Sequence, residues 1–266
     1  MESFQGKVIV ITGSGSGIGL ALSRALGGEG GRIVISDQSG ERVEQASATL
    51  RSDGVECAGC VCDVTRRDEV EALARFAVEH YGQADVIINN AGIGQVPMGI
   101  IDMDVDAFRR VMEVNLFGVL NGIQVFGKLF REQGTPAAIY NVGSENSIYP
   151  CVPACHAYVA SKHSVLAVTE LLAEEVPDFI DVAVIMPGLV ETDMTRDLFS
   201  GMDADAFAGT IVEQLKQGAL YAVSHAYNRV RLDERTARIG QAYDTYAPRY
   251  DGDDEFDIRS LISKMS

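Results

Sequence analysis

Short apolar runs alternate along the chain with longer stretches whose apolar residues recur at helical spacing. Six runs are apolar at nearly every position, which is typical of strands buried on both faces of a sheet. We predict these strands at Lys7–Thr12, Arg32–Asp37, Cys57–Val64, Asp85–Asn89, Ala138–Val142 and Asp181–Met186. We predict the helices between them at Ile18–Leu26, Arg42–Arg51, Arg67–His80, Asp106–Arg131 and Tyr158–Val176. This alternation predicts a doubly wound parallel sheet with right-handed crossovers and helices on both faces.

The pattern changes after the sixth strand. We predict helical pieces over residues 192–217, a last short strand at Leu220–Val223, and a helix at Arg229–Tyr246 that leads into the acidic segment DGDDEFD. No Pro/Ser-rich linker, internal repeat or low-complexity tract interrupts the chain. We therefore predict one domain over residues 1–266. Within it we expect residues 192–217 to form a lid over a substrate, and residues 229–266 to form a C-terminal helix and an acidic tail.

The charge balance limits the classes of partner. The 266 residues include 38 acidic and 22 basic side chains, a formal net charge of −16, and no basic run offsets this locally. Such a chain repels phosphate backbones, so we expect no nucleic acid partner. The longest apolar runs are far shorter than the ~18–20 residues that cross a bilayer, and the N-terminus lacks the basic start and cleavage site of a signal peptide. We therefore expect a cytoplasmic protein with no membrane partner.

The five cysteines form two clusters, Cys57, Cys60 and Cys62 in one and Cys151 and Cys155 in the other. An odd number in this arrangement is unlike the disulfide framework of a small secreted domain, so we expect reduced thiols. The first cluster would suit zinc only if a second cysteine pair or a histidine cluster completed four ligands, and none does. We therefore predict no metal site.

A glycine-rich turn joins the first strand to the first helix. It reads Thr12-Gly13-Ser14-Gly15-Ser16-Gly17-Ile18-Gly19, which fits T-G-x-x-x-G-x-G but not G-x-G-x-x-G. Bare backbone N–H groups and a helix N-terminus meet there, where a pyrophosphate can bind. Asp37 ends the second strand 24 residues after Gly13, close to the ~20 expected of a carboxylate that binds the adenosine ribose hydroxyls. The alternative is a tight turn followed by an ordinary surface aspartate, but the full order of elements favours a Rossmann-type site that prefers NAD to NADP.

Further motifs follow in a fixed order along the chain. They are Asp63-Val64, Asn89-Asn90-Ala91-Gly92, Asn115, Asn141-Val142-Gly143-Ser144, Tyr158-x3-Lys162, and Pro187-Gly188 followed by Thr192. With the glycine-rich turn, they make the chain similar to the classical short-chain dehydrogenase/reductase family from about residue 5 to residue 195. The resemblance implies a homodimer or homotetramer that binds NAD and acts on a small-molecule alcohol or ketone. It also implies a set of cofactor-binding residues: Gly13, Ser16, Gly17, Ile18, Gly19, Asp37, Asp63, Val64, Asn90, Ala91, Gly92, Tyr158, Lys162, Pro187, Gly188, Val190 and Thr192.

The same motifs supply a catalytic set, Asn115, Ser144, Tyr158 and Lys162. Tyr158 and Lys162 are four residues apart on one predicted helix, so their side chains share a face. A nearby ammonium and a cationic nicotinamide both favour the phenolate, which moves the pKa of the tyrosine toward the range of a general base. The resemblance further implies that Lys162 binds the nicotinamide ribose, that Ser144 hydrogen-bonds the substrate oxygen, and that Asn115 holds a water linking Lys162 to a proton relay.

Two features depart from the family pattern. Ser144 precedes Tyr158 by 14 residues, one more than is commonest in the family, and Ser147, at 11 residues, is the competing candidate. We favour Ser144 because it directly follows the fifth strand, whose end fixes a side chain well. The family's frequent closing strand with a Val-Asp-Gly-Gly-like turn is missing, which puts the subunit contacts built there in doubt.

Three other polar residues near the predicted site are weaker candidates. His156 and His163 flank Tyr158 in the sequence, but an ordinary structural or surface role is favoured for both. Arg196 has the guanidinium geometry that suits a substrate carboxylate, although a charged stretch of this kind is more often simply solvated.

The sequence predicts an oxidoreductase that interconverts a secondary alcohol and a ketone by hydride transfer with NAD. Its pocket walls are expected at Ile93–Met98, Tyr149–Cys155, Leu189–Val190 and residues 192–207, the last supplying Met194, Leu198, Phe199, Met202 and Phe207. These mostly apolar walls favour a bulky apolar or aromatic substrate. The run after Leu220 loosely resembles short-chain dehydrogenases that act on benzylic alcohols. Two alternatives stay open, an NAD-using isomerase or dehydratase on the same scaffold and a non-catalytic NAD-sensing regulator.

Overall fold

The computed structural model describes residues 1–192 and 200–263. Its contacts group the chain into two compact units, Met1–His225 and Ala226–Ser266. The first unit holds the whole sheet and every residue that the sequence assigned to the site, apart from those at 193–199. The second contains the predicted C-terminal helix and acidic tail.

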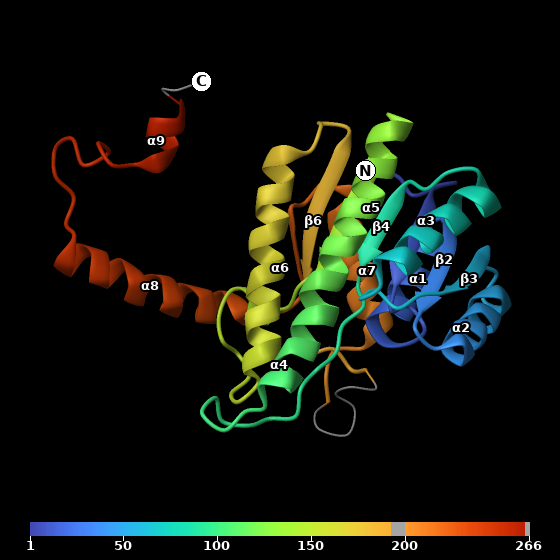
Figure 1. The fold of residues 1–266 in the computed structure, drawn as a ribbon, viewed down its shortest axis with the longest axis horizontal. Coiled ribbons are helices and arrows are strands. Elements are labelled where there is room, and N and C mark those ends of the chain that lie inside the picture. Colours follow the sequence, from blue (N-terminus) through green and yellow to red (C-terminus); the bar gives the residue numbers. More distant parts are fainter. Residues whose placement is uncertain (193–199, 264–266) are drawn as a thin grey trace. The chain divides into compact units, whose positions relative to one another are not determined.

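One parallel sheet of seven strands forms the centre of the first unit, in the order β3-β2-β1-β4-β5-β6-β7 (Figure 1). This confirms the predicted doubly wound α/β fold. The strand order reverses between β1 and β4, and a crevice outside the carboxyl ends of the strands at such a point is where ligands bind in this fold. The strands are β1 (Val8–Thr12), β2 (Arg32–Asp37), β3 (Cys57–Val61), β4 (Val86–Asn89), β5 (Ala137–Val142), β6 (Ile180–Met186) and β7 (Tyr221–Val223).

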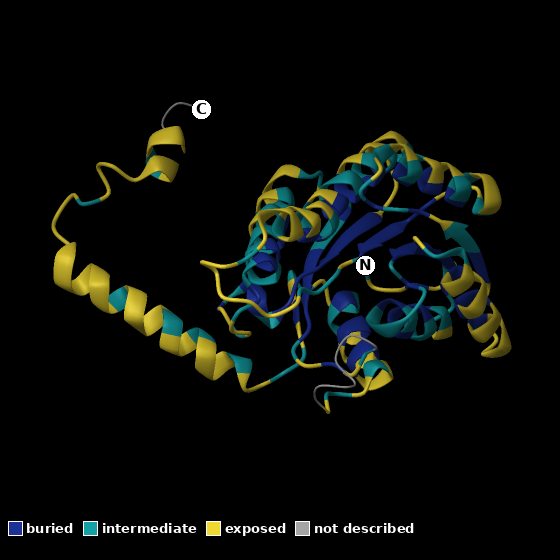
Figure 2. Ribbon diagram, turned by 60° about the horizontal axis from the view of Figure 1, so that its bottom comes forward, coloured by how far each residue is buried: buried dark blue, intermediate teal, exposed yellow. Residues whose placement is uncertain are grey.

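Helices cover both faces of this sheet and enclose two separate cores. Alternate residues of β1 point to opposite sides, so Ile9 and Ile11 enter one core while Val8 and Val10 enter the other. The first core is closed by α1 (Gly17–Gly28), α2 (Gly40–Ser52) and α7 (Ala204–Lys216). The second is closed by α3 (Arg67–Tyr81), α5 (Gly118–Gln133) and α6 (His156–Glu175). The strands in Figure 2 are accordingly buried along most of their length.

The helical half of the expected lid belongs to the first core. Phe207 is 0% exposed and packs in the cluster that α1 and α7 share, together with Ile211 and Leu215. This corrects the predicted position of Phe207, which does not line a substrate pocket. Apolar residues at helical spacing look the same whether a helix closes a cleft or packs on a sheet. Met194, Arg196, Leu198 and Phe199 lie outside the described residues.

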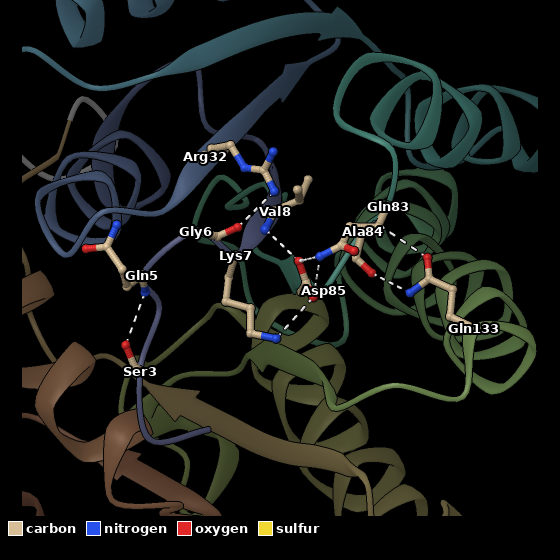
Figure 3. A network of polar contacts seen from close by, with 10 residues as sticks. All are labelled: Ser3, Gln5, Gly6, Lys7, Val8, Arg32, Gln83, Ala84, Asp85 and Gln133. Atoms are coloured by element: carbon tan, nitrogen blue, oxygen red, sulfur yellow. Dashed lines mark hydrogen bonds and ion pairs between the residues drawn. The ribbon is translucent and has the colours of Figure 1, made fainter.

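The buried carboxylate of Asp85 lies at the amino ends of the central strands, just before β4, where it holds the neighbouring chain by hydrogen bonds (Figure 3). It accepts hydrogen bonds from Val8 N at 2.8 Å, Lys7 Nζ at 3.2 Å and the side-chain amide of Gln83. Since a buried charge is tolerated only when it is paired and hydrogen-bonded, these partners explain an aspartate at this position. The network aligns the starts of β1 and β4, the two strands whose far ends carry the glycine-rich turn and the Asn90 turn described below.

The second unit contains α8 (Asn228–Tyr246) and the short α9 (Ile258–Ser263). Neither helix has a buried residue, as the ribbon of Figure 2 shows by its colours. Large side chains in this unit, such as Tyr243, Tyr246 and Phe256, are exposed. In the two described stretches of the chain, no helix combines the length and the apolar composition that a membrane crossing needs.

Candidate active site

A cleft of about 510 Å³ lies at the carboxyl edge of the sheet, where β1, β4, β5 and β6 end. Every residue that we predicted to bind the cofactor lines it, as does Ser144. Asn115 is not among the lining residues but contacts them from behind. Ile93 and Gly94, which we expected in a pocket wall, line the cleft too, as do Val142 and Gly143 of the motif that ends at Ser144. The sequence analysis did not single out four further lining residues, Gln38, Arg42, Cys62 and Val114.

The glycine-rich turn is shaped for close contact with a ligand. Gly13 has φ +62° and lies so near Ala91 that an added Cβ would come 2.7 Å from the Ala91 Cα. At Gly19 a Cβ would lie 2.6 Å from the carbonyl oxygen of Gly13. No side chain caps the N-terminus of α1, although Ser16 stands at the N-cap. The turn therefore leaves bare backbone at the positive end of a helix, which is the arrangement that binds phosphate.

A second turn is locked against the first. The hydroxyl of Thr12 accepts hydrogen bonds from the backbone N–H groups of Asn90 at 3.0 Å and Ala91 at 3.1 Å. In return, the amide of Asn90 donates to the carbonyl oxygens of Thr12 at 2.8 Å and Gly13 at 3.1 Å. These reciprocal bonds explain why Thr12 and Asn90 occur in the two motifs, since together they hold the β1 and β4 turns in a single arrangement.

Asp37 lies at the end of β2, 7% exposed and facing the cleft. Its Oδ1 accepts the N–H of Ser39 at 3.0 Å. Its Oδ2 is so close to Gly15 that a Cβ there would lie 2.9 Å away, and 2.7 Å from the Cβ of Arg42. The Arg42 side chain is exposed at the rim, and among the described carboxylates none lies within ion-pair distance of its guanidinium. This end of the cleft is therefore lined by a carboxylate and by an arginine that are not ion-paired with each other.

Asn115 occupies a local widening of the long helix predicted over Asp106–Arg131. The structure divides that helix into α4 (Val105–Met112), a π-helical turn over Glu113–Phe117, and α5. The fully buried Asn115 accepts the N–H of Ile93 at 2.8 Å and donates to Ile93 O at 3.0 Å and Ser161 Oγ at 3.2 Å. Single π-helical turns occur often at functional sites, and here the turn lets one side chain tie the β4 loop to α6.

The two candidate serines have different places. Ser144 lines the cleft, and its side chain hydrogen-bonds with that of Tyr158. Ser147 lies in the short 3₁₀ turn that follows (Glu145–Ser147), 1% exposed, where its hydroxyl accepts the N–H of Ser144 at 3.1 Å. Ser144 Oγ in turn accepts the N–H of Asn146 at 3.1 Å. The geometry thus favours Ser144 as the substrate-facing hydroxyl, with Ser147 holding it in place.

Tyr158 lies in the first turn of α6, half-buried, and lines the cleft. Burial raises its pKa above the ordinary value, the hydrogen bond with Ser144 lowers it, and the nearby carboxylate of Glu145 raises it. We expected a lowered pKa from the neighbouring ammonium. The protein's own groups shift the pKa the other way, because enclosing a phenol disfavours its charged form more than the hydrogen bond with Ser144 favours it.

The Lys162 side chain is 4% exposed, and its Nζ donates to the carbonyl oxygen of Val142 at 2.7 Å. Burial lowers the pKa of this ammonium to about 8. No carboxylate in residues 1–192 or 200–263 lies within ion-pair distance of it. A Cβ at Gly92 would lie 3.7 Å from Nζ and 3.3 Å from Asn115 Oδ1, so these three predicted residues meet at one point.

Gln95 is a positioning residue that the sequence analysis did not single out. Its side-chain oxygen accepts the N–H groups of Ala157 at 2.7 Å and Tyr158 at 3.2 Å, and its nitrogen donates to Ala154 O at 3.2 Å. It therefore caps the N-terminus of α6, for which the N-cap residue Cys155 supplies no side-chain bond. A cap contributed by a distant loop has no local sequence signature.

The other expected pocket walls are less apolar than the sequence suggested. Val96, Met98 and Val152 are exposed to solvent. The carboxylate of Glu145 accepts from Tyr149 Oη at 3.4 Å and Cys151 Sγ at 3.0 Å, which places an acid in the expected wall segment Tyr149–Cys155.

The two candidate histidines make structural contacts. His156 Nε2 contacts Met98 O at 3.0 Å, a link between two loops. His163 Nδ1 contacts the carbonyl of Val159 on its own helix at 3.0 Å. Within the described residues no group of three or more His, Cys, Asp or Glu side chains is arranged to hold a metal ion.

Comparison with known proteins agrees with this geometry. The family model described as short chain dehydrogenase matches residues 7–203. A 1-deoxy-11-beta-hydroxypentalenate dehydrogenase of Streptomyces exfoliatus is 31% identical over 87% of this chain and 87% of its own. A diacetyl reductase of Staphylococcus epidermidis is 31% identical over 71% of this chain and 73% of its own.

Among solved structures, a short-chain dehydrogenase/reductase from Burkholderia phymatum in complex with NAD superposes with a TM-score of 0.86. It is 27% identical, and the match covers 91% of this chain and 96% of that one. A shared fold, a family model that covers most of the chain and relatives that are 31% identical lead to one conclusion: the chain belongs to the short-chain dehydrogenase/reductase family of oxidoreductases.

Proposed function

We propose that this protein uses NAD to interconvert a secondary alcohol and a ketone, with Tyr158 as general acid and base. The observation that carries the proposal is the meeting of Ser144, Tyr158 and Lys162 at one end of a cleft whose other end holds Asp37. A nucleotide site at one end and a proton-transfer site at the other are what a hydride-transfer enzyme needs.

The residues present fit a dinucleotide. Added Cβ atoms at Gly13, Gly15 or Gly19 would clash with neighbouring atoms, so the turn is as bare as a bound pyrophosphate requires. The cleft volume of about 510 Å³ lies in the range of cofactor sites. Asp37 suits the ribose hydroxyls of the adenosine half, and Lys162 suits those of the nicotinamide half. The solved relative that carries NAD supports the same assignment.

Bound NAD supplies the hydride acceptor when the alcohol is oxidised and the donor when the ketone is reduced. The chain itself moves the proton. Tyr158 takes the hydroxyl proton of the alcohol or returns it to the ketone oxygen, and Ser144, hydrogen-bonded to the same phenol, holds that substrate oxygen in reach. Because the Tyr158 pKa is raised by the protein's own burial, the phenolate needs a cation nearby before it can act as a base at neutral pH.

Lys162 and Asn115 support this proton transfer from the cleft wall. The Lys162 Nζ carries three N–H donors and spends one on Val142 O, which leaves donors for a ribose hydroxyl or a water. Ile93 N–H takes one lone pair of Asn115 Oδ1, which leaves the other for the water that the family resemblance implies. We therefore propose that Asn115 combines two tasks, holding the β4 loop and ordering the relay.

Two features support a substrate with a bulky apolar or aromatic body. The cleft wall includes the apolar side chains of Ile93 and Val190, and Tyr149 is buried in the loop that follows Ser144. One relative is named as a dehydrogenase of 1-deoxy-11-beta-hydroxypentalenate. The carboxylate of Glu145 does not line the cleft, but its charge acts on the Tyr158 phenol, so a substrate that carries a carboxylate fits this end less well than a neutral one.

We further propose a homo-oligomer. The second unit exposes Tyr243 and Tyr246 on α8 and Phe256 in the segment before α9, and neither helix buries a residue. Large exposed aromatic groups of this kind mark surfaces that contact another chain. Light scattering of the full-length protein should give at least twice the chain mass, and replacing both Tyr243 and Tyr246 with aspartate should reduce it. A protein that stays monomeric at all concentrations overturns this assignment.

The function is tested with a panel of secondary alcohols of increasing size. The purified protein is incubated with each alcohol and NAD⁺ or NADP⁺, and the absorbance of the reduced cofactor is followed. We expect turnover with NAD⁺ and a rise in kcat/KM from small alcohols to aryl alkyl carbinols. Tight NAD⁺ binding without turnover of any alcohol or ketone would favour a nucleotide-sensing regulator instead.

A further inference from the structure

We propose that Ser224 and His225 are positioning residues that fix the turn after β6, and through it the nicotinamide end of the cleft. The inference rests on the proposed function, because it assigns that end of the cleft to the reacting half of NAD. Neither residue lines the cleft. Their effect is therefore indirect, through the backbone of Pro187, Gly188 and Leu189.

The sheet brings the two segments together. Strands β6 and β7 are parallel neighbours, with Met186 opposite Val223. Their next residues therefore leave the same edge side by side, Pro187-Gly188 from β6 and Ser224-His225 from β7. Pro187, Gly188, Val190 and Thr192 all line the cleft, so any group that holds this turn also sets the cleft wall.

A closed chain of hydrogen bonds joins the two segments. The Gly188 N–H donates to Ser224 Oγ at 3.4 Å, and Ser224 Oγ lies 2.7 Å from His225 Nδ1. His225 Nε2 lies 3.1 Å from the carbonyl oxygen of Leu189. A carbonyl oxygen only accepts, so Nε2 carries the proton, and in the neutral ring Nδ1 accepts from the serine hydroxyl. Each of the three donors in this series of hydrogen bonds, the Gly188 N–H, the Ser224 hydroxyl and His225 Nε2, then has an acceptor.

The imidazole also explains why residue 188 is glycine. A Cβ on Gly188 would lie 2.4 Å from Cγ, 2.5 Å from Nδ1 and 2.9 Å from Cδ2 of His225. Gly188 is absent from the glycines with positive φ, so its backbone suits any L-residue. The ring of His225, packed flat on the turn, is thus the feature of the described structure that excludes a side chain there.

The same turn is held from two further directions. The N–H of Glu145, next to Ser144, donates to Pro187 O at 2.8 Å. Leu189 O also accepts the N–H of Met202 at 2.8 Å, and Glu191 N–H donates to Met202 O at 2.9 Å. The carbonyl that His225 engages therefore lies where the β6 turn meets residue 202. Removing the imidazole therefore removes one hydrogen bond to the Leu189 carbonyl oxygen, while the hydrogen bonds from the N–H groups of Glu145 and Met202 remain.

The first test separates the two ring nitrogens. His225→Gln keeps a donor near the place of Nε2, His225→Asn keeps a group near Nδ1, and His225→Ala keeps neither. We expect the alanine and asparagine variants to weaken NAD⁺ binding, measured calorimetrically, about tenfold, the scale of one hydrogen bond. The glutamine variant should recover most of that loss. His80→Ala is the control, because this exposed histidine on α3 contacts only Phe76 and Tyr81 among aromatic rings and lies outside the cleft lining.

The second test uses the contact between ring and glycine. Gly188→Ala alone should weaken NAD⁺ binding at least tenfold, because its methyl group displaces the turn. In Gly188→Ala combined with His225→Ala the methyl group has room, so the double variant should bind NAD⁺ better than Gly188→Ala alone. Equal binding of the single and double variants would mean that the bound cofactor, not His225, requires the glycine, and would overturn the inference.

The outcomes distinguish this inference from the proposed function. If the unaltered protein binds NAD⁺ and oxidises alcohols while all three His225 variants match it in NAD⁺ affinity, only the positioning role fails. If the variants lose thermal stability but keep the wild-type affinity, the residues serve folding alone and the role also fails. If the unaltered protein binds no NAD⁺, both proposals fail together.

Discussion

The Nζ atom of Lys162 lies 5.7 Å from the centre of the Tyr158 ring, one turn further along α6. Both side chains reach the cleft from this helix, and Gln95 caps its start with two hydrogen bonds. The i, i+4 spacing gives the two groups a common face, but their ionisation depends on how far each is enclosed. In this protein burial disfavours the charged form of both side chains. It raises the pKa of the Tyr158 phenol and lowers the pKa of the Lys162 ammonium.

The buried ammonium of Lys162 lowers the free energy of unfolding, because it loses its hydration without gaining an ion pair among the residues that the structure describes. An apolar side chain at this position would not carry this penalty. A pKa lowered from 10.5 to about 8 corresponds to roughly 3 kcal/mol against the charged form at neutral pH. We therefore predict that Lys162→Met unfolds at the same temperature as the wild type or a higher one at pH 7, while alcohol oxidation is lost. Thermal melts monitored by circular dichroism measure the first effect and NADH formation the second.

The difference in stability between the wild type and Lys162→Met should decrease as the pH rises. Between about 8 and 10.5 the unfolded lysine holds a proton that the folded one has released, so the wild type gains stability with rising pH in this window. The advantage of Lys162→Met should thus shrink from pH 7 to pH 10. A methionine variant that is markedly less stable than the wild type at pH 7 would show that the ammonium is a net stabilising group.

The two serines should respond differently to removal of the hydroxyl. Ser144→Ala deletes the group that faces Tyr158, so kcat should fall severely, and loss of the buried cap on the Asn146 N–H should lower stability by about 1 kcal/mol, as for Ser147. Ser147→Ala removes a buried cap on the Ser144 N–H, which costs about 1 kcal/mol of stability and lowers kcat only mildly. Steady-state kinetics paired with thermal melts check both, and the reverse order in kcat would move the substrate contact to Ser147.

Coenzyme choice should depend on the Asp37 and Arg42 pair. The carboxylate rejects a 2′-phosphate, so we predict that the wild type favours NAD over NADP by at least tenfold in kcat/KM, about 1.4 kcal/mol. Asp37→Ala should narrow this ratio, because the carboxylate no longer repels the 2′-phosphate and the exposed guanidinium of Arg42 can bind it. Adding Arg42→Ala to that variant should remove the gain with NADP. Equal use of both coenzymes by the unaltered protein would contradict the role of Asp37.

Much of this fold and site was predictable because the deciding signals are local. Near-continuous apolar runs marked the buried strands, and glycines at fixed spacing marked the turn at which β1 ends. The third strand stops at Val61, three residues before its predicted end at Val64. There the N–H of Cys62 still donates to Asp37 O, but the chain then turns into an Asx turn closed by the carboxylate of Asp63, which accepts from Thr65.

The remaining features depend on contacts between distant segments. The amide of Gln95 caps α6 across 62 residues of sequence, and the ring of His225 fills the space above Gly188 across 37 residues, 225 minus 188. No periodicity marks such pairs. Phe207 was placed wrongly for a related reason, since an apolar face on α7 identifies a helix that is buried but not the surface that buries it.

The central claim, that Tyr158 transfers the proton while NAD exchanges the hydride, is tested most directly by single-turnover kinetics of Tyr158→Phe. This substitution keeps the ring on α6 and removes only the hydroxyl. With NAD⁺ bound and a saturating alcohol, the rate of NADH formation should fall by ~10²–10⁴ relative to the wild type, while calorimetric NAD⁺ affinity stays within twofold. A phenylalanine variant that forms NADH at close to the wild-type rate would contradict the mechanism.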